Sequence, residues 1–206
     1  MRSSLHSDFS VLKRVRTPEK IQAYIERIPF NHELDGETCM SPLRVLHENK
    51  AHCIEGAMLA CVALMMCGEK PLLMNLKVET TDFDHVVTVF KRGEHYGAIS
   101  KTNHLVLRYR DPVYRSVREL AMSYFHEYFL TTTGKKTMLG YSGLINMRRF
   151  GTQWMTRDDD LWDIAEVIYD MPYTRVTSAL RAHVLRNATS FERSGAHIEE
   201  WPKKVI

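Results

Sequence analysis

The segment Ala51–Cys67, AHCIEGAMLACVALMMC, decides the fold of this chain. Alanine, leucine and methionine dominate it and favour a helix, and Gly68 follows in the position of a helix C-cap. The segment is apolar on nearly every face, which indicates a central rather than a peripheral helix. Its apolar run, Gly56–Cys67, is shorter than the roughly 20 residues that a bilayer span needs, so we expect a buried core helix.

Two shorter helices are expected before this segment. Thr17 and Pro18 form the pattern of an N-cap followed by proline at the first helical position. An apolar stripe then continues to Ile28, and Pro29 ends the helix. The second helix is expected over Pro42–Glu48. The first sixteen residues are polar and basic, and we expect them to be loosely ordered.

After Gly68 the pattern changes to that of β-strands. The segment Asp84–Lys91, DHVVTVFK, is rich in β-branched residues and predicts a strand. Arg92-Gly93-Glu94 fits a hairpin turn after it. Further strands are expected over Leu72–Glu79, His95–Ser100 and His104–Arg110, with Asp111-Pro112 as a turn.

The rest of the chain has mainly helical patterns. Helices are expected over Val117–Leu130, Asp159–Asp170, Arg175–Arg186 and Ser190–Trp201, with a loop at Thr131–Lys136. Helices, a meander of antiparallel strands and more helices make an α+β layout. We therefore expect a single domain over residues 1–206, in which a central cysteine-bearing helix packs on an antiparallel sheet and a helical extension covers roughly residues 117–206.

Composition narrows the class of protein. Hydrophobic residues make up 44% and charged residues 26% of the 206 residues, which excludes disordered, collagen-like and coiled-coil compositions. A formal net charge of +3 does not by itself indicate nucleic-acid binding. The N-terminal residues lack the apolar stretch of a secretory signal, and the four cysteines include no CxxC pair. We expect a cytoplasmic protein with free thiols and no membrane segment.

Cys53 is the candidate nucleophile. It falls in the first turn of the central helix, where the helix dipole and free backbone N–H groups lower the pKa of a thiol. The thiolate is the reactive form, and the same N–H groups could hold an oxyanion. The plainer interpretation is that a free cysteine is a small buried apolar residue. We expect that role for Cys61 and Cys67, and Cys39 falls in a loop.

His85 is the candidate base, because it opens the predicted strand beside a loop. A third group would orient its imidazole and fix its tautomer. If Gly93-Glu94 is a two-residue hairpin loop, His85 faces Thr102, with Ser100 on the same face. If the loop has three residues, His85 faces Asn103 instead. Ser100 and Asn103 are therefore the two candidates, and the loop length decides between them.

Together these residues resemble the transglutaminase-like core of the papain-like cysteine superfamily. The family has a cysteine that starts a core helix, then a strand-initial histidine, then a hairpin and a second strand that ends in an acid. The matching segments here are Cys53-Ile54-Glu55-Gly56-Ala57, His85-Val86-Val87-Thr88-Val89-Phe90 and Tyr96-Gly97-Ala98-Ile99-Ser100. The resemblance covers roughly residues 38–110. Ser100 stands where the family has its acid, and Val86 stands where the family has an aromatic residue.

The resemblance implies a cysteine-dependent acyl-transfer enzyme that needs no cofactor. Cys53 would attack an amide or ester carbonyl with His85 as the base, and an acyl-enzyme would form. Resolution by water would make the protein a protease or amidase, and resolution by an amine would make it an acyltransferase. The substrate would be a peptide, a protein or a small amide. The alternative is a catalytically inactive member of the same fold that binds a peptide or another protein.

Arg108 and Arg110 are candidate substrate-binding residues. They lie in RYRDPVYR, where arginines alternate with aromatic residues. Guanidinium groups bind carboxylates and phosphates, and tyrosines stack on bases, so an acidic substrate or single-stranded nucleic acid would fit. Such arginines more often pair with local acids, here Asp111 or Glu119, and nucleic acid is the less favoured partner. The ten histidines form no metal-binding spacing, and no glycine-rich phosphate motif is present.

Overall fold

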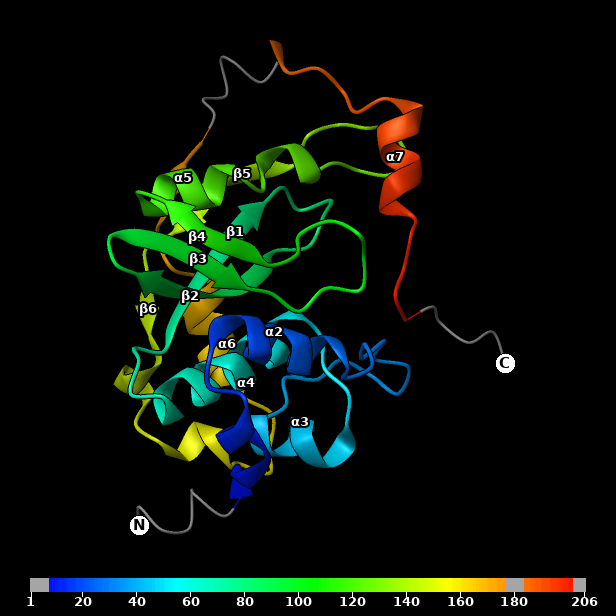
Figure 1. The fold of residues 1–206 in the computed structure, drawn as a ribbon. Coiled ribbons are helices and arrows are strands. Elements are labelled where there is room, and N and C mark those ends of the chain that lie inside the picture. The colour runs from blue at the N-terminus through cyan, green and yellow to red at the C-terminus, as the bar shows by residue number, and fades with distance from the viewer. Residues whose placement is uncertain (1–7, 177–183, 202–206) are drawn as a thin grey trace.

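The computed structural model describes residues 8–176 and 184–201. In it, an antiparallel sheet lies between two layers of helices (Figure 1). Within these residues the sheet has seven strands, in the order β4-β3-β2-β1-β5-β7, and β6 also pairs with β1. Every pairing is antiparallel, so the expected α+β class is confirmed. The strands are β1 (Leu72–Val78), β2 (His85–Arg92), β3 (His95–Ile99), β4 (Arg110–Tyr114), β5 (Met138–Ser142), β6 (Ile145–Asn146) and β7 (Tyr173–Arg175).

One face of the sheet carries the central helix α4 (Cys53–Met66), which is surrounded by further helices in Figure 1. Every residue from Ile54 to Leu64 is buried, which explains why this helix is apolar on all sides. The other face carries α5 (Val117–Met122), whose Leu120 and Ala121 pack with Val87 and Val89. Helix α4 packs against α2 (Pro18–Glu26), α3 (Pro42–Glu48) and the 3-10 helix η1 (Ser10–Arg14). Helix α6 (Trp162–Tyr169) contacts β1 and contributes to the same core.

The two helices expected before α4 are confirmed, since their caps are local signals. The Thr17 side chain accepts a hydrogen bond from Lys20 N at 3.4 Å, and Ser41 accepts one from Arg44 N at 3.3 Å. Each helix has proline at its first position, where no N–H is needed. The expectation of loose order is wrong for residues 8–16, because η1 buries Leu12 in the core. Residues 1–7 lie outside the described residues.

The hairpin between β2 and β3 has a two-residue loop. Arg92 pairs with His95, and Gly93 between them has a φ of 57°, a left-handed conformation that favours glycine. This register brings Ser100, directly after β3, toward the start of β2. The two-residue alternative of the sequence analysis is therefore the one the chain adopts.

Helix α4 is fixed on the sheet by a hydrogen bond and by a close approach. Thr88 Oγ1 donates to the carbonyl of Ala57 at 2.6 Å. Gly56 lies so close to Lys101 that a Cβ at this position would overlap the Lys101 Cβ. Lys101 is buried, its Nζ donates to the Ile28 carbonyl, and burial lowers its pKa to about 8. Gly56 thus sets the distance between the cysteine helix and the chain that follows Ser100.

Replacing Gly56 by alanine is expected to destabilise the protein by about 1–3 kcal/mol, the usual cost of adding a methyl group to a packed core. The higher helix propensity of alanine offsets only part of this cost. Urea unfolding measures the difference. Gly143→Ala is the control, because a Cβ at that position meets nothing within 4 Å. A Gly56→Ala protein as stable as the Gly143→Ala protein would contradict the close approach.

The strand expected over His104–Arg110 is wrong, and so is the turn at Asp111-Pro112. Residues 104–109 form a loop, in which Leu107 has a φ of 61°, and β4 begins at Arg110. Strand β4 lies at the edge of the sheet. An edge strand tolerates Pro112, because one side of it needs no N–H donors.

The C-terminal extension is not only helical, which corrects the expectation for roughly residues 117–206. Strand β5 pairs with β1 inside the sheet, and β6 and β7 add to it. Helix α6 confirms the helix expected over Asp159–Asp170, whereas Val117–Leu130 holds only a short helix and a 3-10 turn. Of Arg175–Arg186, Arg175 belongs to β7 and 177–183 lie outside the described residues. The remaining elements are α5 (Val117–Met122), η2 (Phe125–Glu127), η3 (Met147–Phe150), η4 (Gln153–Met155) and α7 (Ser190–Ala196).

Among the residues that the structure describes, no helix is both long and apolar enough to span a bilayer.

Candidate active site

Cys53 is the first residue of α4 and is partly exposed. Burial opposes ionisation of its thiol, but hydrogen bonds to His52 and His85 outweigh burial and lower the pKa to about 5. The positive charge of both imidazoles and the first turn of the helix act in the same direction. The two histidines therefore favour the thiolate form of Cys53.

His52 is the N-cap residue of α4 and carries a positive charge. Its Nε2 donates to the Thr38 carbonyl at 2.9 Å and lies 3.4 Å from Glu55 Oε1. Burial disfavours the charged ring, but hydrogen bonds to Cys53 and Glu55 prevail and raise the pKa to about 11.

Glu55 is a fully buried carboxylate one turn into the same helix. It accepts hydrogen bonds from the backbone N–H groups of His52 and Met40, both at 2.9 Å, and from Thr38 Oγ1 at 2.8 Å. Burial raises the pKa of this carboxyl, but the bonds to His52 and to these N–H groups overcome that effect and lower it. A buried charge is tolerated only when it is satisfied in this way. Glu55 thus keeps His52 protonated beside the thiol.

His85 is the first residue of β2 and is buried, and it bonds Ser100 rather than a carboxylate. Its Nε2 lies 2.8 Å from Ser100 Oγ. The Ser100 hydroxyl donates its one hydrogen to the carbonyl of Leu107, so Oγ can only accept from the imidazole. His85 Nε2 therefore carries the hydrogen, and Nδ1 is left to face Cys53. The structure thus brings together Cys53, His85 and Ser100.

Ser100 is also fixed through its backbone. Gln22 of α2 donates from Nε2 to the Ser100 carbonyl at 2.8 Å and accepts from the Ser100 N–H through Oε1 at 2.9 Å. The Gln22 side-chain amide thus bonds the backbone of Ser100 as a neighbouring strand would, at a position where β4 no longer pairs with the chain after β3. Ser100 is consequently held at its N–H, its carbonyl and its hydroxyl.

Asn103, the second candidate to orient His85, has another role. Its Oδ1 accepts from the Trp201 N–H at 2.9 Å, and its carbonyl accepts from the Glu200 N–H at 2.8 Å. The side chain therefore anchors the C-terminal segment. This outcome agrees with the two-residue hairpin loop, which favours Ser100.

The structure pairs Arg108 and Arg110, the candidate substrate-binding residues, with acids of the same chain. Arg108 pairs with Glu200 at 2.8 Å and lies 3.6 Å from Glu26. Arg110 pairs with Glu127 at 2.6 Å. Both guanidinium groups are thus occupied within the chain, as arginines at a strand edge often are, although the acids are not those expected from local sequence.

Tyr128 adds a buried hydroxyl to this region. Among the described residues it has no hydrogen-bond partner for its OH, although only 3% of the residue is exposed. Burial, followed by the negative charges of Cys53 and nearby aspartates, raises the pKa of Tyr128, so the group stays a neutral donor. A buried donor without a partner in the folded chain marks Tyr128 as a group that the fold alone does not explain.

Sequence reasoning missed Glu55, Gln22, Tyr128 and the role of His52. The sequence does contain a signal for His52 and Glu55, because they have the three-residue spacing of a capping box at the start of the helix. Gln22 lies in a helix far from Ser100 in sequence and gives no local signal. Its contact depends on how α2 packs.

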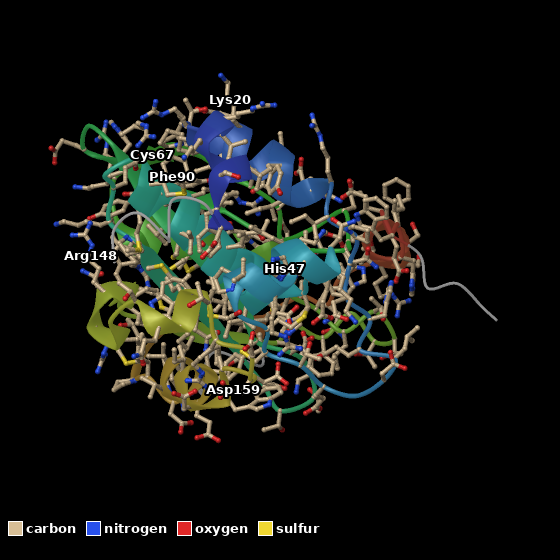
Figure 2. The ribbon with its side chains drawn as sticks, turned by 90° about the horizontal axis from the view of Figure 1, so that it is seen from below. Lys20, His47, Cys67, Phe90, Arg148 and Asp159 are labelled. Carbon is tan, nitrogen blue, oxygen red and sulfur yellow. The ribbon has the colours of Figure 1, made fainter. Side chains whose placement is uncertain are left out.

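The other thiols are not part of this site. Cys39 and Cys61 are fully buried, and burial raises the pKa of both. Cys67, expected in the core, is partly exposed at the opposite end of α4, and Figure 2 shows it on the side of the molecule away from α7. All four cysteines lie in the described residues and are unpaired. Within those residues no cluster of three or more His, Cys, Asp or Glu could hold a metal ion.

No model of a known protein family matches this chain, and no curated protein matches it.

Proposed function

We propose that the protein is a cysteine-dependent acyl-transfer enzyme with a transglutaminase-like arrangement of Cys53 and His85. One observation carries the proposal: a helix-initial thiol with a pKa of about 5, hydrogen-bonded by two imidazoles, one of which is oriented by Ser100. A structural cysteine in a core needs none of these groups. Nucleophilic cysteines, in contrast, are found where positive charge stabilises the thiolate.

The chemistry follows from the positions of the groups. The Cys53 proton resides on His85 Nδ1 once the thiolate has formed. The sulfur attacks the carbonyl carbon, the C–S bond forms, and the carbonyl electron pair moves to oxygen. When the carbon–nitrogen or carbon–oxygen bond breaks, His85 returns the proton to the leaving group. Water or an amine then attacks the thioester and gives its proton to His85, and the thiolate leaves.

The two histidines have different roles in this scheme. His85 exchanges a proton, because its Nδ1 faces the sulfur and its Nε2–H is fixed by Ser100. His52 stays charged, because Glu55 and the Thr38 carbonyl hold its Nε2 hydrogen. His52 therefore stabilises the thiolate electrostatically and takes no part in proton transfer.

The oxyanion needs donors near Cys53. The N–H groups in the first turn of a helix have no partner within the helix, and they point toward its N-terminal end. The Tyr128 hydroxyl, buried and without a partner among the described residues, is our candidate for a second donor. Both kinds of donor would stabilise negative charge where it develops.

The substrate class in this proposal is an acyl group joined as an amide or ester, in a peptide, a protein or a small molecule. A low-pKa thiol survives best in a reducing compartment, so the proposal includes a cytoplasmic location.

Acetylation by p-nitrophenyl acetate tests the proposal. We expect one acetyl group on Cys53 after acid quenching, with a rate that reaches half its plateau near pH 5. Peptide mapping by mass spectrometry reads each thiol separately. Addition of a primary amine during turnover distinguishes transfer from hydrolysis, because only transfer yields the acetylated amine.

Cys67 is the internal control for this experiment, since it is also partly exposed. Burial and then the charge of Glu69 raise the pKa of Cys67, so its acetylation should increase only in the alkaline range. If Cys53 follows the same pH profile as Cys67, the enzyme proposal fails. A peptide- or protein-binding module of the same fold would then be the better conclusion.

A further inference from the structure

Leu107, whose carbonyl accepts the Ser100 hydroxyl, has an unusual backbone conformation. Its φ of 61° lies in the left-handed region, which a bulky residue rarely adopts. Strained backbone persists only where neighbouring groups enforce it, and it concentrates at functional sites. The groups that hold Leu107 therefore determine what the Ser100 hydroxyl can do.

Glu127 holds Leu107 from the opposite side. Its Oε2 accepts the Leu107 N–H at 2.6 Å, and its Oε1 accepts from Arg110 at 2.6 Å. Both bonds involve an ionised group, which makes them stronger than bonds between neutral groups. The carboxylate thus couples the loop after β3 to the first residue of β4.

Arg110 is itself fixed on the face of the sheet away from α4. Its Nε donates to Ser123 Oγ at 3.0 Å, a second nitrogen donates to the Ser123 carbonyl at 3.3 Å, and its guanidinium lies 4.1 Å from the centre of the Tyr124 ring. These contacts anchor Arg110 to the end of α5. A continuous set of hydrogen bonds therefore runs from Arg110 through Glu127, Leu107 and Ser100 to His85.

We propose that Glu127 and Arg110 are positioning residues that hold the Leu107 carbonyl against the Ser100 hydroxyl. The hydroxyl then has no hydrogen to give to His85, so the imidazole keeps its hydrogen on Nε2, and Nδ1 is the nitrogen that takes up and returns the proton of Cys53. The catalytic meaning of this arrangement rests on the proposed function, but the tautomer of His85 does not.

This arrangement also explains how a neutral serine can replace a carboxylate beside His85. In a Ser100→Asp variant, a carboxylate oxygen would face the Leu107 carbonyl with no hydrogen between them. The two oxygens would repel each other, so the added charge would displace either the loop or the new side chain. We therefore expect Ser100→Asp to be no more active than Ser100→Ala.

The test uses Glu127→Ala with Glu119→Ala as its matched control. Glu119 also accepts a loop N–H, that of Arg115 at 2.7 Å, but it has no link to Ser100. The first readout is the ¹⁵N spectrum of the imidazoles in a Cys53→Ala background, where no thiol proton can pass to His85, and His85→Gln identifies the His85 signals. The second readout is the acetylation rate of Cys53. Glu127→Gln provides a milder change, because its amide oxygen can still accept the Leu107 N–H.

In Glu127→Ala we expect His85 to lose its preference for the Nε2–H tautomer and acyl transfer to fall about tenfold or more, the usual effect of losing an outer positioning group. Glu119→Ala should match the wild type in both readouts, and Glu127→Gln should fall between. A wild-type His85 spectrum in Glu127→Ala would overturn the proposal, and so would a Ser100→Asp protein that exceeds the wild-type rate. If the wild-type chain is never acetylated but the tautomer of His85 still depends on Glu127, the positioning role is supported and the proposed enzyme activity is refuted.

Discussion

Alanine in place of Cys53 is expected to abolish acyl transfer, with a loss of at least about a thousandfold. No other thiol can substitute for it, because Cys39 and Cys61 are buried and Cys67 lies at the far end of α4. The fold should persist with a stability change of about 1 kcal/mol or less, since position 53 is partly exposed and alanine favours a helix. Turnover of p-nitrophenyl acetate and urea unfolding measure the two effects.

Cys67→Ala is the matched control for this variant, because it removes the other partly exposed thiol, at the opposite end of the same helix. It should leave turnover unchanged. Full turnover in Cys53→Ala would eliminate the mechanism. A Cys53→Ala chain that is unfolded would show instead that the thiolate and its two histidines stabilise the helix start.

The helices and the central hairpin could be predicted from sequence because their signals are local. Thr17 and Ser41 cap helices that begin with proline, and the apolar segment before Gly68 defines α4. Gly93 marks a two-residue hairpin loop. Each of these features depends on residues only a few positions apart.

The strands after β4 could not be predicted, because their stability comes from distant partners. Strand β5 pairs with β1 across the intervening hairpin and α5, and β7 is only three residues long. Short strands of this kind have little intrinsic preference and depend on the sheet they join. The same limit explains why residues 104–109, whose apolar residues resemble those of a strand, form a loop.

The residues of the candidate site also divide into those that local sequence predicts and those that it does not. Cys53 at a helix start, His85 at a strand start and Ser100 on the returning strand follow from periodicity and hairpin register. Gln22 and Glu127 reach the site from separate elements, so only the folded chain brings them there. A positioning network can thus be long in sequence and still be compact in space.

Glutamine in place of His85 is expected to slow turnover by about 10²–10⁴-fold, because glutamine can donate a hydrogen bond but cannot accept and return a proton. Nitrophenolate leaves without protonation, so acetylation of Cys53 should be less affected than hydrolysis of the thioester. The acetyl-enzyme should therefore accumulate in His85→Gln and be visible by mass spectrometry. Pre-steady-state release of nitrophenolate would separate the two steps.

A comparison with His52→Gln makes this prediction specific. His52 stabilises the thiolate, so its loss should raise the pKa of Cys53 from about 5 and slow acetylation at acidic pH. Alkaline pH ionises the thiol directly and should restore the rate of acetylation in His52→Gln. Alkaline pH cannot restore a missing proton carrier, so His85→Gln should stay slow in hydrolysis throughout. His95→Gln, at the other end of the same hairpin, should behave as the wild type. Equal hydrolysis rates in His85→Gln and His95→Gln would exclude His85 as the base, and recovery of His85→Gln at alkaline pH would assign it the electrostatic role that we give to His52.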